Sequence, residues 1–406
     1  MSGLLLVRGA RQLLTLRGAS RARRGPALRD LGLIQDGALL IREGLIASVG
    51  PSRRVENLSE ARAAREIDAF GRVVMPGFVD SHTHLAAGSL RFAEPEGRPE
   101  IARGLPGSRL LLEARRNLGM LIRHGTTTLE AKAGTPGDEV GGLKLLRALA
   151  ALNQRPLDVI PTCLVGGLIP LEYRGKPDDY LHWMCSQFLP KIRRRRLARF
   201  VDVMCAPDGF TLSQAGRCLE AAKKVGFRVK VHAEQASHDG GAQLAVDHGA
   251  VSADHLTYAS EDDIGRLAAS STVATLLPGG IIHSAADRLP PARALIDAGA
   301  AVALATGLSP AAPSPLNMQM VVALACSCLD MTPAEALAAA TINGAHALGL
   351  AERVGSLEAG KQADLLVLDV PDYREMPYHF GGNLVAMTLK RGEVLYREGE
   401  VRWPED

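Results

Sequence analysis

The middle of the chain alternates short apolar segments, rich in β-branched residues, with amphipathic stretches of about 10 to 20 residues. Several of the amphipathic stretches end on glycine, as helices commonly do. Eight buried strands alternating with helices predict an α/β fold of the TIM-like (β/α)8 barrel class. An open, doubly wound sheet fits the same alternation, but no GxGxxG follows the first strand and polar residues cluster at strand ends, which favours the barrel. The predicted strands span residues 72–84, 125–132, 157–166, 199–207, 227–234, 250–257, 271–279 and 301–307.

The two ends of the chain have a different pattern. Residues 1–70 consist of short β-like pieces separated by glycine-containing turns, such as LLLVRGA, GALLIREG and LIASVG. The same pattern returns near the C-terminus in ADLLVLDV and NLVAMTLKRGEVLY. We therefore predict one small, β-sandwich-like domain built from residues 1–70 together with 351–406, and a barrel domain over residues 71–350.

The composition and net charge of the chain indicate which classes of partner to expect. Hydrophobic residues make up 47% and charged residues 22% of the 406 residues, as in ordinary globular proteins. Lysine and arginine exceed aspartate and glutamate by 47 − 44 = 3, too few to imply nucleic acid or an anionic membrane as partner. The arginine run 193–196 lies in a predicted helix, where a solvated face accounts for it. A small-molecule partner is expected, with a homodimer as the assembly considered.

Cysteine usage and hydropathy indicate a cytoplasmic protein. None of the six cysteines forms a CxxC pair, and most lie in apolar segments, which is typical of reduced, buried thiols. No apolar run approaches the roughly 18 residues that a membrane span requires. The N-terminus is rich in arginine, but its strand-turn-strand pattern favours folded structure over a transit peptide.

Chemically active side chains recur where the predicted strands end. In VMPGFVDSHTHL, His82 and His84 alternate along a strand and therefore point to one face. A single histidine of this kind is more often a hydrogen-bonded structural residue than a ligand. However, the active sites of barrels gather at the C-terminal strand ends, so the whole set predicts one site. The other members are Glu130 and Lys132, His232, Glu234 and Gln235, and Asp254 and His255.

Three imidazoles at one rim suit a mononuclear Zn²⁺ or Fe²⁺ site with open positions for water. Such a metal lowers the pKa of bound water to about 7 and polarises a carbonyl or an amide. The implied chemistry is hydrolysis.

The motifs PGFVDSHTH, VHAEQ and SADHL together resemble the amidohydrolase superfamily and, within it, the imidazolonepropionase family, whose members open a cyclic amide ring in histidine degradation. The resemblance runs from about residue 30 to about residue 395. It implies one divalent metal, Zn or Fe, because no lysine ends the fourth strand. It also implies roles for individual residues: His82, His84 and His232 as metal ligands, His255 as a catalytic histidine, Gln235 beside the water, and Arg91, Glu130 and Lys132 toward the substrate.

This chain departs from the family at the pocket. The family's last strand ends on an aspartate that ligates the metal and takes a proton from its water, and here the aligned position is Gly307. Further departures are Gly167, Ala206 and Thr135. Glu234 is the expected replacement base, because strand alternation puts it on the face of His232, with Asp254 as the second candidate.

Three functions remain open at this point. The first is a metal-dependent amidohydrolase that opens a cyclic amide, as imidazolonepropionases do. The second is a catalytically impaired relative that keeps the barrel for binding or assembly, which Gly307 favours. The third is a ligand-binding protein that uses the barrel mouth without metal. Metal content separates the third from the others, and turnover of a cyclic amide separates the first from the second.

Overall fold

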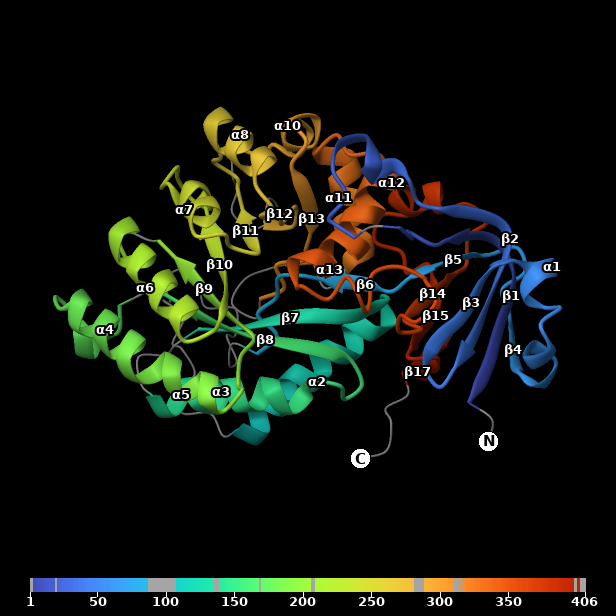
Figure 1. Ribbon diagram of the computed structural model, residues 1–406, viewed down its shortest axis with the longest axis horizontal. Helices are drawn as coiled ribbons and strands as arrows, with labels where there is room; N and C mark the ends of the chain where they lie inside the picture. Colours follow the sequence, from blue (N-terminus) through green and yellow to red (C-terminus); the bar gives the residue numbers. More distant parts are fainter. Residues whose placement is uncertain are drawn as a thin grey trace.

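The computed structural model describes residues 3–18, 20–86, 107–134, 139–167, 169–205, 209–280, 288–309, 314–315, 317–397 and 400–401. Its strands form two sheets, of eight and nine strands. Figure 1 shows the larger sheet wrapped by helices and the smaller one set to the side of it. Among the described residues, no helix combines the length and apolarity needed to cross a bilayer.

The larger sheet is a barrel of parallel strands. Neighbouring strands pair in chain order, from the first to the eighth. This confirms the (β/α)8 class predicted from the alternating pattern. The strands are β6 (Phe78–Asp80), β7 (Thr126–Gly134), β8 (Asp158–Val165), β9 (Phe200–Met204), β10 (Arg228–Ala233), β11 (Ser252–His255), β12 (Val273–Leu276) and β13 (Ala301–Leu304).

The barrel closes through backbone bonds just beyond the ends of its first and last strands. The N–H of Gly307 donates to the carbonyl of His82 at 3.1 Å, and the N–H of His84 donates to that of Leu308 at 2.6 Å. The two histidines of the first strand are therefore held against the segment that follows β13.

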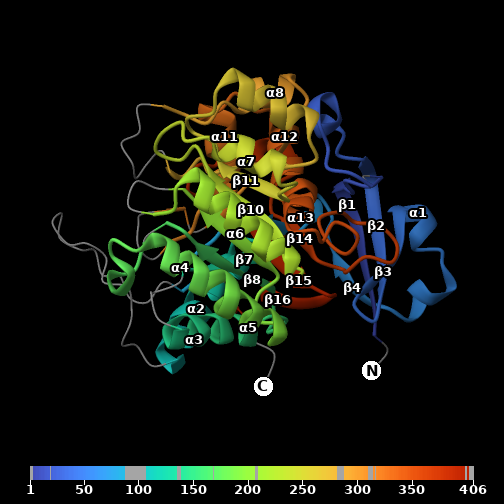
Figure 2. The ribbon, with the colours of Figure 1, turned by 60° about the vertical axis from the view of Figure 1, so that its left-hand side comes forward.

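Helices cover the outside of the barrel, as Figure 2 shows for α6, α7 and α8. Three of the helices begin with a capping box, in which a Ser or Thr and the third helical residue satisfy each other's backbone N–H groups. The helices are α2 (Gly107–Arg123), α3 (Glu139–Leu152), α4 (Pro177–Trp183), α5 (Leu189–Arg194), α6 (Leu212–Lys224), α7 (Gly241–Asp247), α8 (Glu261–Ala269), α10 (Ala292–Asp297), α11 (Met318–Cys328), α12 (Pro333–Ala338) and α13 (Gly344–Ala347).

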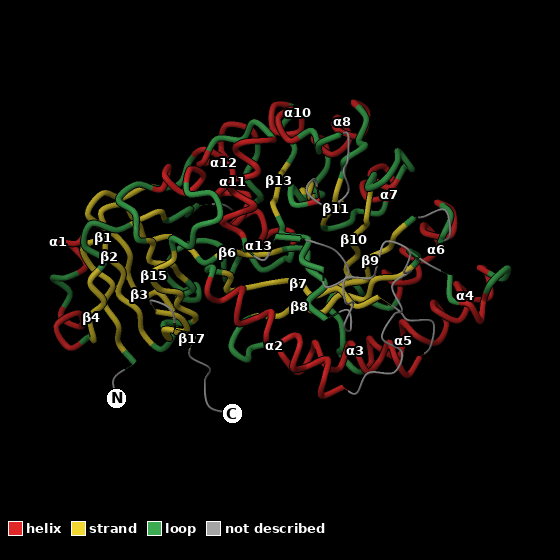
Figure 3. Tube along the Cα trace, turned by 180° about the vertical axis from the view of Figure 1, so that it is seen from behind, coloured by secondary structure: helices red, strands yellow, loops and turns green. Residues whose placement is uncertain are grey.

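The smaller sheet contains strands from both ends of the chain, and Figure 3 shows it at the side of the barrel. β5 pairs with β1 on one side and with β14 on the other, so the chain leaves this sheet only at Pro76, five residues beyond the predicted boundary at 71. The strands are β1 (Leu4–Leu14), β2 (Leu33–Arg42), β3 (Leu45–Pro51), β4 (Arg65–Asp68), β5 (Val73–Pro76), β14 (Leu365–Leu368), β15 (Val385–Lys390), β16 (Glu393–Arg397) and β17 (Glu400–Val401). The short helix α1 (Ser52–Val55) follows β3.

The chain passes from the small sheet into the barrel at Gly77, between β5 and β6. A Cβ at this position would lie 2.3 Å from the side chain of Thr127, so only glycine fits between the two strands. The Pro-Gly pair that interrupts the apolar run VMPGFVD therefore marks the crossing that delivers His82 to the rim.

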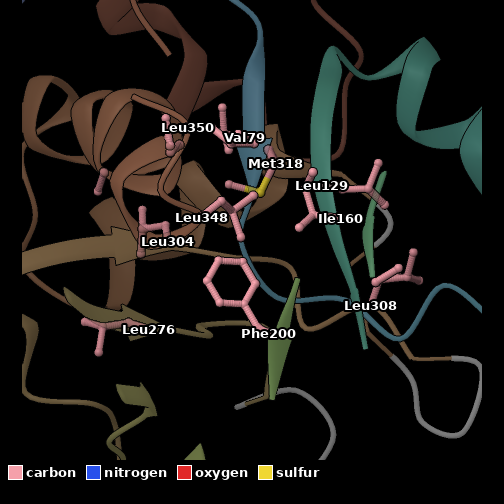
Figure 4. Packing of buried hydrophobic residues seen from close by; sticks show 14 of the residues in the cluster. Val79, Leu129, Ile160, Phe200, Leu276, Leu304, Leu308, Met318, Leu348 and Leu350 are labelled. Atoms are coloured by element: carbon pink, nitrogen blue, oxygen red, sulfur yellow. The ribbon is translucent and has the colours of Figure 1, made fainter. Parts of the chain in front are cut away.

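The barrel interior combines an apolar layer with a charged one. Figure 4 shows Phe200, Leu304 and Leu348 among the buried residues of the main core. Strand register sets Asp202 beside Lys230 and His232 beside Asp254, all of them buried. Charged groups at such depth require partners, and the pairing of these groups forms the site described below.

A second buried charge cluster joins the barrel to the small sheet. The Lys390 ammonium at the end of β15 lies 2.8 Å from Asp158 Oδ2, in the first residue of β8, and 2.7 Å from Asp364 Oδ2. Arg391 bonds to the other oxygen of Asp158. The carboxylate of Asp158 therefore takes both its cations from the opposite domain.

Candidate metal centre

Three imidazoles converge at the C-terminal rim of the barrel. His82 and His84 follow β6, and His232 is the fifth residue of β10. One nitrogen from each lies within 4.8 Å of the other two. The ring centroids of His82 and His232 are 4.8 Å apart, and those of His82 and His84 are 5.4 Å apart. This spacing suits nitrogen ligands around a single ion.

Carboxylates hold two of these imidazoles from behind. His82 Nδ1 lies 2.8 Å from Asp254 Oδ2, and His232 Nδ1 faces Asp202 Oδ2 at 3.0 Å. A carboxylate on Nδ1 fixes the tautomer that leaves Nε2 with its lone pair toward the site. This hydrogen bond orients the His82 ring as a ligand, and the carboxylate of Asp202 faces the ring of His232 as a negative charge.

The imidazoles of His82 and His84 are held neutral, as metal ligation requires. Burial is the main cause: it lowers the pKa of His82 well below its usual value and that of His84 to about 3. Neutral, converging, carboxylate-backed imidazoles fit a divalent transition metal.

Two buried lysines neutralise the carboxylates. The Lys132 ammonium lies 2.9 Å from Asp254 and 3.0 Å from Glu130, and it also contacts Asp202. Although burial alone lowers it, these three carboxylates raise the pKa of Lys132 well above its ordinary value. Lys230 Nζ lies 2.6 Å from Glu130 and 3.5 Å from Asp254.

Glu130 and Lys132, expected toward the substrate, take part in this buried network. Both side chains are fully buried, and Glu130 also accepts a hydrogen bond from the hydroxyl of Thr162 at 2.5 Å. All of these contacts are with protein groups, and the role toward the substrate that the resemblance implied stays a prediction. Arg91, the third residue expected on the substrate, lies outside the described residues.

His255 joins the three imidazoles at the end of β11. Its ring centroid is 5.0 Å from that of His82 and 4.9 Å from that of His232. Its backbone has a φ of 85°, which an L-residue adopts only at a cost. Within the part of the chain that the structure describes, its buried Nε2 has no hydrogen-bond partner. This nitrogen has capacity left for a substrate or a water molecule.

Glu234 does not share a face with His232. The strand ends at Ala233, and a φ of 50° at Glu234 turns its carboxylate into the following loop. Its two oxygens accept hydrogen bonds from the backbone N–H groups of Asp239, at 2.6 Å, and Ala242, at 2.9 Å. Strand alternation, the argument for Glu234 as replacement base, therefore fails here. The side chain of Gln235, next in the chain, is exposed.

The position of the missing aspartate is occupied by backbone alone. Gly307 has a φ of 63°, and a Cβ there would lie 2.8 Å from Cδ2 of Leu277. The preceding Thr306 donates to Asp80 from its N–H at 3.0 Å and from its hydroxyl at 2.6 Å. Burial raises the pKa of Asp80 to about 7. Both oxygens of the Asp80 carboxylate are thus engaged with Thr306.

Of the three other departures from the family, one lies in the described part of the chain. Gly167 is described, and a Cβ there would lie 3.0 Å from the sulfur of Met204. Ala206 and Thr135 lie outside the described residues.

Asp202 and Lys230 are not among the residues that the sequence motifs predicted for the site. Asp202 interrupts the apolar strand FVDVM, Lys230 stands between Val229 and Val231 in β10, and both are fully buried. Because a buried charge needs a partner, these two interruptions could have been recognised as members of a network.

Comparison with known proteins identifies the family. A family model described as the amidohydrolase family matches residues 73–395. The chain belongs to the amidohydrolase family. This amidohydrolase is 39% identical over 429 residues to an imidazolonepropionase of Geobacillus kaustophilus, with 98% of this chain and 99% of the relative covered. It is 40% identical over 410 residues to an imidazolonepropionase of Parabacteroides distasonis, with 96% and 98% covered. The resemblance that the sequence motifs indicated is confirmed.

Solved structures share the amidohydrolase fold at lower identity. An adenosine deaminase from Xanthomonas campestris with bound zinc superposes with a TM-score of 0.73 at 20% identity, over 98% of this chain and 94% of that one. The Escherichia coli guanine deaminase gives a TM-score of 0.73 at 18% identity, over 98% and 99%. At these identities the likeness establishes the fold alone.

Proposed function

We propose that this amidohydrolase hydrolyses a C–N bond in a cyclic amide of the imidazolone propionate type. One divalent metal, Zn or Fe, is the cofactor, with His82, His84 and His232 as its ligands. The observation that carries the proposal is the convergence of three imidazoles, two of them backed by carboxylates, in a chain about 40% identical to imidazolonepropionases.

In this proposal, side chains of the protein orient the metal ligands for a metal that activates the substrate and the water. When bound, the metal polarises the amide carbonyl and acidifies water. Asp254 and Asp202 orient the imidazoles of His82 and His232, and Lys132 keeps the two carboxylates charged.

His255 moves the proton in this proposal. Its unpartnered Nε2 accepts a proton from the attacking water, as a general base. The resulting imidazolium returns that proton to the ring nitrogen as the C–N bond breaks. The hydroxyl ends on the carbonyl carbon and the proton on the nitrogen, so the ring opens with one water consumed.

Metal analysis and turnover test the proposal together. Protein purified without chelators is expected to carry one Zn or Fe per chain and to open imidazolone propionate, and chelation should abolish this activity until metal returns. His255→Gln should keep the metal and lose about 10²–10⁴ in rate. The matched control is His379→Gln, at an exposed histidine outside the site, and it should leave both unchanged. Metal-loaded protein without turnover would contradict the proposal.

A catalytically impaired relative is the second candidate, favoured by Gly307. Gly307→Asp tests it, because an aspartate restores an anionic ligand and a base. Metal affinity and hydrolysis are expected to rise, the latter by up to about 10²-fold. Aspartate in the left-handed backbone at φ 63° should lower the stability by about 1 kcal/mol. The Cδ2 methyl of Leu277 must also move to make room for the new Cβ.

Gly307→Asn is the matched control for this variant. Asparagine tolerates the left-handed backbone as aspartate does but brings no charge, so it should reproduce the stability cost without the gain in metal affinity. If Gly307→Asp folds, binds no more metal than the parent and turns over no faster, the impaired-relative candidate is preferred.

A further inference from the structure

A cavity of about 1320 Å³ opens at the end of the barrel opposite to the histidines. Its barrel wall includes Arg228 and Val273, the first residues of β10 and β12. Its other wall is formed by residues 17–18 and 20–30, which follow β1 and include the short helix η1 (Gly25–Arg29). Arg24 fixes this segment by backbone pairing with Ala301, at the start of β13. Figure 2 shows the segment in blue beside α12.

The cavity is strongly basic. Six cationic side chains and one carboxylate, that of Asp30, line it. Arg23 is buried, and Asp30 and Glu358 act on its charge. The other five have no carboxylate within ion-pair distance among the residues that the structure describes. These are Arg17, Arg21, Arg24, Lys223 and Arg228.

Two of these cations are fixed by carbonyl groups without being neutralised. The guanidinium of Arg24 donates to the carbonyls of Ala268, at 2.9 Å, and Ser270. Lys223 Nζ donates to the carbonyl of His248 at 2.8 Å. Carbonyls orient these groups but carry no net negative charge, so the positive charge remains.

Arg228 packs against an apolar surface, with its guanidinium carbon 5.7 Å from the ring centroid of Phe200. Arg17 and Arg21 are exposed, and their side chains make no hydrogen bond within the described parts of the chain. The cavity therefore combines cations that carbonyls hold in place with two exposed guanidinium groups. A concave wall of one sign of charge concentrates counter-ions of the other sign.

We propose that this cavity binds a small anion with two or more phosphate groups, of about the size of a nucleoside diphosphate. Guanidinium groups match phosphate oxygens in a bidentate manner, and several of them together select for more than one phosphate. The cavity, at about 1320 Å³, is larger than the roughly 300–1,000 Å³ of most small-molecule sites, so a metabolite with several phosphate groups fits in it with room to spare. With a net charge of only +3, the whole protein gives no reason to expect a nucleic acid there.

The cavity is separate from the metal centre but shares a strand with it. Arg228 and His232 are four residues apart on β10, which at about 3.3 Å per residue is about 13 Å. A ligand in the cavity therefore does not compete with an amide substrate at the histidines.

Calorimetric titration of the full-length protein with pyrophosphate, at physiological salt, tests the inference. Saturable binding of one pyrophosphate per chain is expected. The double variant Arg17→Gln, Arg21→Gln should weaken it by about 10-fold or more, because each lost charge-assisted hydrogen bond counts for about that factor. The matched control is Arg53→Gln, Arg54→Gln, which removes two exposed arginines of α1 and the same charge. It should change the affinity by less than about twofold.

Each other outcome overturns the inference. Binding that falls equally in both double variants would be a response to net charge and not to the cavity. If binding does not saturate at millimolar pyrophosphate, the cavity is not a specific site for this anion. Tighter, competing binding of a short RNA would mean that the basic wall serves a macromolecule. All three readouts are independent of amide hydrolysis, so they stand whether or not the proposed function holds.

Discussion

Asp254→Asn is expected to lower the free energy of unfolding of the metal-free protein by about 3–5 kcal/mol, because it removes one carboxylate from a buried network that holds two lysines. The same change leaves His82 without its charged partner and should weaken metal binding by about 10–100-fold. Denaturant unfolding and metal titration measure the two effects. Asp247→Asn, at an exposed position of α7, is the matched control and should stay within about 0.5 kcal/mol of the parent.

The loss should also depend on pH in a definite way. Burial alone raises the pKa of Asp254, but Lys132 and Lys230 outweigh burial and hold it well below the ordinary value of 3.8. A carboxylate with a depressed folded pKa stabilises the fold at every pH above its unfolded pKa, and the contribution is lost as the pH falls through the folded pKa. The difference between parent and variant should therefore be constant from about pH 5 to 8 and shrink only below about pH 4. A difference that disappears near neutrality would contradict this account.

Lys390→Met is expected to destabilise the protein by about 3 kcal/mol or more, because Asp364 and Asp158 lose their shared buried cation. Methionine keeps most of the volume of the side chain, so the effect reports charge and not packing. Burial already raises the pKa of Asp364, and the loss of Lys390 should raise it further. Protonation then relieves part of the penalty, so the destabilisation should be smaller at pH 5 than at pH 8, in contrast to the Asp254 variant.

Urea unfolding at the two pH values measures this effect. Lys224→Met, at an exposed position of α6, is the matched control and should change the stability by less than about 0.5 kcal/mol. A Lys390→Met protein as stable as the parent would mean that Arg391 alone satisfies Asp158.

The sequence predicts the barrel and the meeting of the histidines for one physical reason. Parallel strands end at a common rim, so polar residues at strand ends come together whatever the exact register. Register itself is not readable from one strand, and it decides that Asp202 lies beside Lys230 and that His232 lies beside Asp254. The pairing of Asp202 with Lys230 could therefore not be predicted, although both residues are present in the sequence.

Backbone conformation is the other limit. The alternation that made Glu234 a candidate base holds only while the chain stays extended, and a φ of 50° ends it one residue too early. At Gly307 the sequence alone reveals a departure from the family. Only the structure shows that the N–H of Gly307 donates to the carbonyl of His82. Side-chain identity is read from sequence, whereas the direction in which a side chain points is set by one torsion angle.

The position of β5 has a consequence for how this chain folds. Its partner β14 begins 365 − 73 = 292 residues later, with the whole barrel between them. During synthesis the hydrogen-bonding edge of β5 stays open until nearly the entire chain has emerged, and pairings of such sequence separation form slowly. Open strand edges are also templates for association with other chains. The small sheet is thus the last part of the molecule that can be completed, and aggregation competes with folding mainly at this edge.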